Sequence, residues 1–507
     1  MYKKTALISL PKQDLLRPPG ALSILAAACD ECHVDYEVFD FNLWLYRNIP
    51  VDIWTQIDNN WHKFDPLKDQ QEEFYLTFKT KLKEYVDLVL DSNPDLISIS
   101  VFTDESAACA LELIKELNIP NRPYDIVIGG SGIRAHLATV TDQDFCQYLL
   151  KEKLIEYFLY GEGEIVFRKV LSKDFNYGGI NNFDADQIEN LDQFPFPSYK
   201  KINPYDYEFA ASPELIVTGS RGCVRKCTYC DVANYWPKFR YRSGQNIADE
   251  MYFYHKTVGI ARYEFSDSLI NGSLKSFKEM NQALVKYKEQ DPTFKPSYKG
   301  QFICRPSIHM KEDDYKTAKE AGCDYIYVGV ETFSDKVRHD MKKKFNNIDL
   351  DYHLDMCGKY NIANSFLMFV GYPTETLADH KENLKYLLKY QKYAQAGVIT
   401  LITFGYTASI LKGTPLDIMR EQMNIVDEYE GFSYEANWVS MDNPTLTLKE
   451  RIRRWVELVE LSQDLNYLQP RVKMLISRYQ QMLDAIKNKR SFIPINADHL
   501  SQEYLVK

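Results

Sequence analysis

The first 175 residues alternate short apolar runs with amphipathic stretches. Residues 20–32 and 105–117 carry apolar side chains at helical spacing, which predicts two helices. Apolar or alternating runs that suit strands occupy residues 5–10, 34–40, 95–101, 124–130 and 155–164. Strands that alternate with helices predict a parallel sheet, whose ligands bind at the carboxyl ends of the strands. The loops after the later strands contain Thr103, Gly129, Gly130, Gly161 and Glu162.

Two segments interrupt this alternation. Residues 43–64 have no clear period and carry Trp44, Trp54 and Trp61. Such a stretch either packs on the domain surface or caps a pocket. Residues 176–213 are rich in Gly, Asn, Asp and Pro and predict a linker that crosses the surface between domains.

A second alternating series begins near residue 214. Strand patterns occur at residues 214–219, 262–267, 300–305, 324–331, 364–371 and 397–404, with helical patterns between them. Six such units predict a sheet that curls into a partial (β/α)6 barrel, with the chemistry at the carboxyl ends of the strands. From about Pro415 onward the chain has a helical and charged pattern, with amphipathic helices expected at residues 446–468 and 469–489.

Charge and length narrow the range of partners. The 507 residues contain 61 Lys and Arg against 71 Asp and Glu, a net charge of −10, which argues against nucleic-acid binding. The short basic run of residues 342–344 is expected to be a solvated helix face. No apolar run approaches the ~18 residues of a membrane helix, and the N-terminal apolar stretch is too short for a signal peptide. We therefore expect a cytoplasmic protein with reduced cysteines.

Three of the ten cysteines, Cys223, Cys227 and Cys230, lie within eight residues in the spacing C-x3-C-x2-C. They follow the first strand of the second series, so they belong to a loop at the active face of the expected barrel. A structural zinc site takes four ligands, and no fourth cysteine follows nearby. Three thiolates suit an iron–sulfur cube that keeps one iron open. Arg225 and its neighbours add positive charge that favours the thiolates.

The remaining seven cysteines are expected to be core thiols, because Cys29 and Cys32 have no partner pair and the others are isolated.

The cysteine motif after the first strand of a six-unit barrel, with Tyr229 before its last cysteine, resembles the radical S-adenosylmethionine (SAM) superfamily. The resemblance implies that the three cysteines hold a [4Fe–4S] cluster and that SAM binds its fourth iron. Strand ends in the family's order supply the implied SAM contacts. These are Tyr229 in the cysteine motif, Ser266 and Asp267 in EFSDS, Arg305 in CRPS, Glu331 in GVETF, and Gly371 in the turn GYPTET.

The first 175 residues resemble the cobalamin-binding domain of one radical SAM subgroup, in the pieces at residues 17–31, 95–107, 125–136 and 160–171 and in the linker at 191–199. The implied cobalamin contacts are Thr103, Gly129, Gly130, Gly161 and Glu162. The chain lacks the D-x-H-x-x-G motif whose histidine ligates cobalt in mutases. A flavodoxin-like sheet with tight turns and no cofactor is the alternative.

The resemblance implies a cobalamin-dependent radical SAM enzyme that methylates an unactivated carbon or phosphorus of a small metabolite, through a 5′-deoxyadenosyl radical and methylcobalamin. It also implies an external electron donor such as flavodoxin or ferredoxin. Two alternatives stay open: a radical SAM cyclisation or oxidation, and a non-enzymatic iron–sulfur or cobalamin sensor. A methylthiotransferase fits less well, because a second cysteine trio near the N-terminus is absent. The expected domains are a cobalamin-binding α/β domain (1–175), a linker (176–213), a radical SAM core (214–415) and a helical C-terminal region (416–507).

Overall fold

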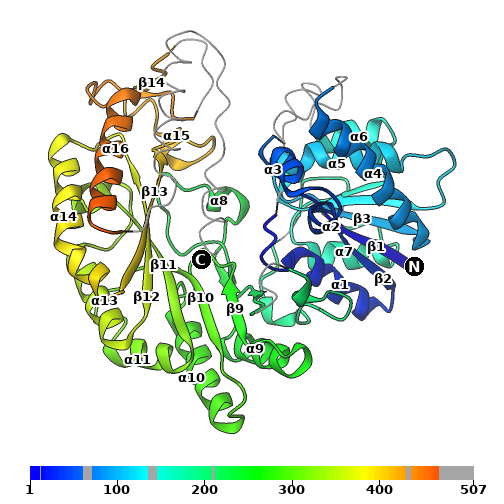
Figure 1. The fold of residues 1–507 in the computed structure, drawn as a ribbon, viewed down its shortest axis with the longest axis horizontal. Coiled ribbons are helices and arrows are strands. Elements are labelled where there is room, and N and C mark those ends of the chain that lie inside the picture. The colour runs from blue at the N-terminus through cyan, green and yellow to red at the C-terminus, as the bar shows by residue number, and fades with distance from the viewer. Residues whose placement is uncertain are drawn as a thin grey trace. The chain divides into compact units, whose positions relative to one another are not determined.

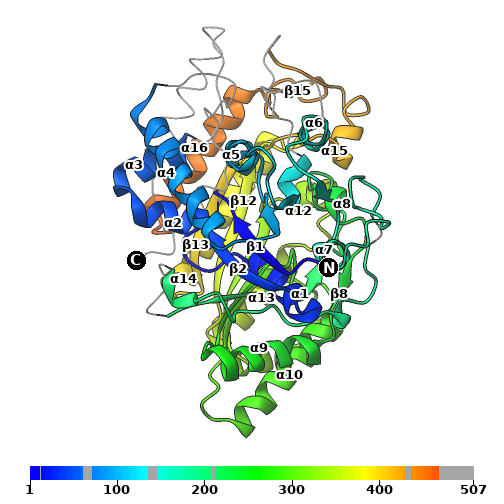
Figure 2. The ribbon, with the colours of Figure 1, turned by 90° about the vertical axis from the view of Figure 1, so that its right-hand side faces the viewer.

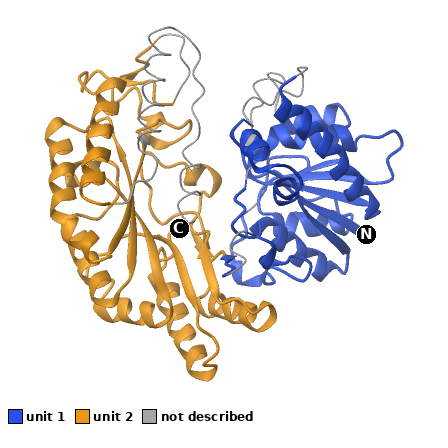
Figure 3. Cartoon of the chain, in the orientation of Figure 1, with its two compact units in different colours: residues 1–216 blue, residues 217–507 orange. Residues whose placement is uncertain are grey.

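The computed structural model divides the chain into two units, residues 1–216 and residues 217–507 (Figures 1 and 3). It describes residues 1–11, 13–60, 71–134, 145–185, 187–207, 212–429 and 435–467. Trp61 and the helix expected at 469–489 lie outside the described residues. The described residues include no helix that is long and apolar enough to cross a membrane.

Unit 1 is built on a parallel sheet of five strands in the order β2-β1-β3-β4-β5, which is the flavodoxin-like order. The strands are β1 (Lys4–Ser9), β2 (Asp35–Asp40), β3 (Leu96–Ser100), β4 (Asp125–Gly129) and β5 (Tyr157–Leu159). The helices are α1 (Gly20–Cys32), α2 (Phe41–Asn48), α3 (Val51–Asn59), α4 (Glu73–Asp91), α5 (Asp104–Leu117), α6 (Phe145–Lys151) and α7 (Gly163–Leu171). The expected parallel sheet of this region is confirmed.

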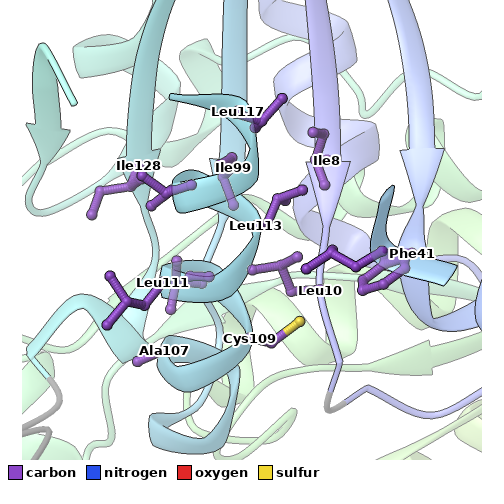
Figure 4. Packing of buried hydrophobic residues seen from close by; sticks show 14 of the residues in the cluster. Ile8, Leu10, Phe41, Ile99, Ala107, Cys109, Leu111, Leu113, Leu117 and Ile128 are labelled. Atoms are coloured by element: carbon purple, nitrogen blue, oxygen red, sulfur yellow. The ribbon is translucent and has the colours of Figure 1, made fainter. Parts of the chain in front are cut away.

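A large apolar cluster joins this sheet to its helices. Figure 4 shows α5 laying Leu111 and Leu113 against strand residues such as Ile99 and Ile128, all of them fully buried or nearly so. The cluster includes Phe41 and Leu45 of α2, while Trp44 and Trp54 pack on its edge as partly buried side chains. The described part of segment 43–64 is therefore helical and packs on the domain.

The segment expected to be a linker packs onto unit 1 for much of its length. Tyr199 and Ile202 are buried, and the Ser198 backbone N–H donates to the Ser23 carbonyl of α1 at 2.9 Å. Lys201 donates to the Asp35 carboxylate of β2 at 2.8 Å. These contacts hold the segment on unit 1.

Unit 2 contains a sheet of six strands in the order β13-β12-β11-β10-β9-β6, so each successive strand is added beside the previous one. The strands are β6 (Leu215–Val217), β9 (Arg262–Phe265), β10 (Ser297–Phe302), β11 (Cys323–Glu331), β12 (Ala363–Val370) and β13 (Ile399–Thr407). The helices between them are α9 (Gly244–Val258), α10 (Leu274–Gln290), α11 (Glu312–Glu320), α12 (Asp335–Asp340), α13 (Asn347–Tyr360) and α14 (Leu377–Gln395). Figures 1 and 2 show α9 and α10 side by side outside the sheet. This order of strands, with helices between them, is the one expected for a partial (β/α)6 barrel.

The region after Pro415 is less helical than its pattern predicts. A single turn, α15 (Pro415–Ile418), is followed by an antiparallel pair, β14 (Ile425–Val426) and β15 (Val439–Ser440), before the long helix α16 (Leu448–Asp464) begins. Asn424 takes a positive φ of 46° just before β14, which ends any helix there. Buried Trp438 donates its indole N–H to the Ala408 carbonyl and fixes this hairpin against β13.

Candidate functional site

The cysteine loop leaves the carboxyl end of β6 in unit 2. It is bounded by a small antiparallel pair, β7 (Ser220–Arg221) and β8 (Arg240–Tyr241), and contains the short helix α8 (Val232–Tyr235). Cys227 is buried at 9% exposure, while Cys223 and Cys230 are partly exposed. Two of the three cysteines are therefore partly exposed at this edge of the sheet.

Thr228, inside the cysteine motif, anchors the loop to three other parts of unit 2. Its backbone N–H donates to the Met341 carbonyl at 3.1 Å, and its carbonyl accepts from the Leu416 N–H at 2.7 Å. Its hydroxyl bonds the Tyr372 hydroxyl at 2.8 Å. Because Thr228 is fully buried, these bonds hold the motif against the end of α12, against α15 and against the turn after β12. No local sequence pattern indicates this role of Thr228.

Cations lie near the thiols of Cys223 and Cys227, whereas burial, Cys227 and Asp231 raise the pKa of Cys230 to about 11. Burial raises the pKa of Cys223, and the Arg225 backbone N–H, Lys343, Arg225 and Arg305 act against that rise. Burial also raises the pKa of Cys227, again opposed by Lys343. Positive charge of this kind stabilises thiolates, the form that binds iron.

Within the described residues, no three His, Cys, Asp or Glu side chains are arranged to hold a metal ion. A [4Fe–4S] cube takes each thiolate on a different iron, so its cysteines need not converge on one point. The three thiols and the cations around them fit that group.

Glu331, at the end of β11, joins two groups from other segments. Its Oε1 accepts from the Tyr229 hydroxyl and from the Lys343 ammonium, both at 2.8 Å. Glu331 has a φ of 64°, in the left-handed region, at an irregularity in the β11–β12 pairing. A non-glycine residue there is strained, and such strain gathers at functional sites.

Lys343 corrects an expectation from the sequence. The run 342–344 is not a helix face, because it lies in the loop between α12 and α13, where Lys342 and Lys344 are exposed and Lys343 is 7% exposed. Burial acts to lower the pKa of Lys343, but Glu331 and Cys227 keep that pKa above its ordinary value. A buried ammonium with this pairing stays charged beside the thiols.

Asp267 and Ser266 follow β9 and differ in accessibility. Asp267 is 4% exposed and accepts from the Gly219 N–H at 2.8 Å and from the Ser220 hydroxyl. Burial raises the pKa of Asp267 to about 7. Its carboxyl group therefore supports the start of the cysteine loop, whereas Ser266 is exposed and bonds Thr218 at 2.8 Å.

Arg305 lies in the loop after β10, near Arg225. One Nη donates to the carbonyls of Asn271 and Gly272, each at 2.9 Å. The Nε atoms of Arg305 and Arg225 are buried without a hydrogen-bond partner in the described part of the chain. Burial, with Arg225 next, lowers the pKa of Arg305 to about 10. Two neighbouring, partly buried guanidinium groups with unused Nε donors are suited to an anionic group.

Gly371 opens the turn that follows β12. Its φ is 86°, and a Cβ there would lie 2.4 Å from Cγ of Arg451 of α16, so a side chain is excluded on both grounds. The Gly371 N–H donates to the buried Glu375 carboxylate at 2.9 Å, and Arg454 of α16 pairs with Glu375 at 3.0 Å. Helix α16 thus holds this turn in place.

The candidate contacts in unit 1 lie at the carboxyl ends of β3, β4 and β5. Thr103 caps α5 through its hydroxyl, which accepts from the Ser106 N–H at 3.2 Å. Gly130 has a φ of 108°, and a Cβ there would lie 2.3 Å from the Val101 carbonyl oxygen. Gly129 ends β4 beside it. The close approach of two loops therefore accounts for Gly130 without any ligand.

Two further features of this edge suit a ligand. Phe102 is 56% exposed between β3 and α5, and the Cα of Gly163 faces open space. Gly161 and Glu162 come between β5 and α7, and the Glu162 carboxylate accepts from the Ile188 N–H at 3.3 Å. An exposed aromatic ring and a bare glycine at the strand ends fit a large flat cofactor.

Comparisons with known proteins identify the class of the second unit. Residues 217–387 match the model of the radical SAM superfamily. The resemblance read from the cysteine motif is confirmed for this segment: residues 217–387 are a radical SAM domain.

Two curated relatives are distant. An uncharacterized methyltransferase of Pyrococcus horikoshii is 24% identical over 327 residues, which cover 61% of this chain and 67% of that protein. The anaerobic magnesium-protoporphyrin IX monomethyl ester cyclase of Synechocystis is 25% identical over 221 residues, 40% of this chain and 42% of that protein. The chain thus spans less than half of the cyclase.

Two solved structures share the fold across both units. The radical SAM methyltransferase TsrM from Kitasatospora setae, with cobalamin and a [4Fe–4S] cluster bound, matches 93% of this chain and 92% of its own, with a TM-score of 0.62 and 16% identity. The cobalamin-dependent SAM radical enzyme OxsB, with aqua-cobalamin and SAM bound, matches 95% of this chain and 71% of its own, with a TM-score of 0.61 and 17% identity. The expected fold class is therefore confirmed, while residue roles stay predictions.

Proposed function

We propose that this chain is a cobalamin-dependent radical SAM enzyme that methylates an unactivated carbon or phosphorus atom of a small metabolite. The observation that carries the proposal is the loop of three cysteines at the carboxyl end of β6, which Thr228 anchors and in which Arg225, Arg305 and Lys343 lie near Cys223. A flavodoxin-order sheet precedes it in the same chain. TsrM, a methyltransferase, and OxsB combine both folds.

Cys223, Cys227 and Cys230 would hold the cluster. Of the predicted SAM contacts, Ser266 and Arg305 have groups that could bind SAM directly. The Ser266 side chain is exposed, and the Arg305 guanidinium retains an unused donor. The other contacts would act by positioning. Asp267 would hold the cysteine loop, Tyr229 would hold Glu331, and Gly371 would hold the GYPTET turn.

Cobalamin would lie at the carboxyl edge of unit 1, against Thr103, Gly129, Gly130, Gly161 and Glu162. When bound, the cluster, SAM and cobalamin would supply two things: an adenosyl radical, which removes a hydrogen atom from the substrate, and a methyl group, which replaces that atom. Phe102 and Gly163 would contribute apolar contact and space. The chain's own task is to bind and orient these groups and to keep water away from them.

The proposal also includes the electron donor and the cellular compartment. An external donor such as flavodoxin or ferredoxin would reduce the cluster. All ten cysteines are free, which suits a reducing compartment such as the cytoplasm. The domain limits at residues 175, 213 and 415 stay predictions.

The test is anaerobic turnover of the full-length chain reconstituted with iron, sulfide and hydroxocobalamin. SAM and a strong reductant are added, and 5′-deoxyadenosine and S-adenosylhomocysteine are measured by mass spectrometry. Cys227→Ala should abolish 5′-deoxyadenosine. Cys304→Ala, which changes a buried cysteine outside the motif, should leave both products.

The similarity to the magnesium-protoporphyrin cyclase favours a second candidate, a radical SAM reaction without methylation. Deoxyadenosine without S-adenosylhomocysteine, from protein that retains no cobalamin, would support that candidate. If a chain with an intact cluster forms neither 5′-deoxyadenosine nor S-adenosylhomocysteine, both candidate reactions would be overturned and a sensor would be favoured.

A further inference from the structure

A pocket of about 300 Å³ opens in unit 1 at the carboxyl end of the edge strand β2. Helices α2 and α4 and the segment 201–207 enclose it, and its walls include Phe39, Trp44, Tyr85, Tyr207 and Asp40. The volume is at the lower end of the range of small-molecule sites. Strand β1 lies between β2 and β3, so the pocket is distinct from the proposed cobalamin contacts after β3, β4 and β5.

Asp40 brings a carboxylate to this pocket without a cationic partner. It caps α2 by accepting from the Leu43 N–H at 3.1 Å, and it accepts from the Tyr207 hydroxyl at 2.8 Å. Among the residues that the structure describes, no Lys, Arg or His forms an ion pair with it. Burial raises the pKa of Asp40 to about 6, so the carboxyl group is mostly ionised at neutral pH.

The two cations on the pocket wall are engaged elsewhere. Arg47 pairs with Asp206 at 3.6 Å, and Lys201 donates to Asp35 at 2.8 Å and to the Tyr36 carbonyl at 2.6 Å. Asp40 is partly buried and has only neutral donors, so a cation that joins it would stabilise its carboxylate. The pocket is open on one side, where a ligand can supply that cation.

Tyr85 adds a hydroxyl group that has no hydrogen-bond partner among the described residues. The side chain is 1% exposed. Its ring packs on Phe41 and Trp44, with ring centroids 4.3 Å and 5.3 Å apart. A phenol oxygen accepts as well as donates, and aromatic faces attract cations.

We propose that this pocket binds a small organic cation, a primary amine that carries an apolar group. The ammonium group is bound by the Asp40 carboxylate and the Tyr85 hydroxyl, and the apolar group lies against Phe39 and Trp44. Anionic ligands are disfavoured, because Asp14 adds a second negative charge near Asp40. The proposal depends on unit 1 alone and not on the radical chemistry.

Isothermal titration calorimetry of the full-length chain near pH 7 tests it. Benzylamine is the probe, and benzyl alcohol, similar in shape but uncharged, is its control. We expect saturable benzylamine binding, at least about tenfold tighter than that of benzyl alcohol. Asp40→Asn should weaken benzylamine about tenfold or more, and it should fold because Asn also caps helices well.

Tyr85→Phe should weaken benzylamine several-fold while keeping the ring contacts. Glu84→Gln, an exposed change on the same helix, should leave benzylamine affinity unchanged. Equal affinity for amine and alcohol, unchanged binding by Asp40→Asn, or no saturable binding below about 10 mM would overturn the proposal. None of these readouts depends on the cluster or SAM.

Discussion

The turn after β12 should depend on the buried ion pair between Arg454 and Glu375. Their side chains are 3% and 1% exposed, with Nη1 and Oε1 3.0 Å apart. Arg454 also donates to the Thr376 carbonyl at 3.1 Å, and Glu375 accepts from the Gly371 N–H at 2.9 Å. Arg454→Met would therefore leave a buried carboxylate inside the turn with one donor.

The size of the effect follows from the burial of both groups. Removing one partner of a buried ion pair costs about 3–5 kcal/mol. Each ~1.4 kcal/mol is a factor of ten, so the equilibrium for local opening of the turn should rise by a factor of about 100 or more. Burial raises the pKa of Glu375 even with Arg454 present, so the carboxylate pays its full desolvation cost once Arg454 is gone. Adding Glu375→Gln removes the buried charge and should restore much of the loss.

Hydrogen exchange of the Gly371–Thr376 amides in the full-length chain measures this opening directly. Protection should fall about 100-fold or more in Arg454→Met and recover in the double variant. The matched control is Arg453→Met on the same helix, because Arg453 is 52% exposed and its pairs with Glu450 and Glu457 lie at the surface. Equal losses in Arg453→Met and Arg454→Met, or a double variant less protected than Arg454→Met, would refute the reasoning.

Three further predictions concern the same unit. Gly371→Ala should lower the thermal midpoint clearly more than Gly397→Ala, since both have positive φ but only Gly371 faces an arginine side chain; calorimetry distinguishes them, and equal shifts would contradict the steric account. The pKa of Asp267, raised by burial to about 7, lies above its unfolded value, so its stabilising contribution should be lost as pH rises from about 4 through 7; Asp267→Asn should flatten that part of the pH–stability profile, and an unchanged profile would contradict the burial argument. Lys343→Met should reduce the iron retained after anaerobic reconstitution, while Lys342→Met, an exposed neighbour, should not; iron analysis decides, and equal retention would remove Lys343 from the site.

Much of the fold could be predicted from the sequence, because buried strands and amphipathic helices carry strong periodic signals. The helix predicted at 20–32 matches α1 residue for residue. Strand β10 begins at Ser297 rather than at Gly300, because the polar residues Ser297 and Lys299 pair with β9, a tertiary contact without a local pattern. Between Pro415 and α16 the helical prediction was wrong for the same reason: the β14–β15 pair depends on the burial of Trp438, not on periodicity. The helix predicted at 446–468 is confirmed by α16.

The site was predicted unevenly. The cysteine motif is local in sequence and needs no fold to be seen. The role of Thr228 comes from a contact with Tyr372, 144 positions away, which no local pattern could reveal. The role of Lys343 comes from its ion pair with Glu331, 12 positions away, and from its place beside Cys227 in the fold. Asp267 was predicted as a SAM contact, but its carboxyl group is buried among donors of its own loop. For the role of Lys343, the only signal in the sequence was its position shortly after the strand that ends in Glu331.

Electron paramagnetic resonance of the reduced, anaerobically reconstituted chain, with and without SAM, tests the central claim most directly. If Cys223, Cys227 and Cys230 hold a [4Fe–4S] cluster with one open iron, a [4Fe–4S]⁺ signal should appear and should change when SAM is added. Cys304→Ala should keep both features, and Cys227→Ala should lose the signal. An undiminished signal in Cys227→Ala, or a spectrum that SAM does not alter, would contradict the assignment of this loop as the radical SAM centre.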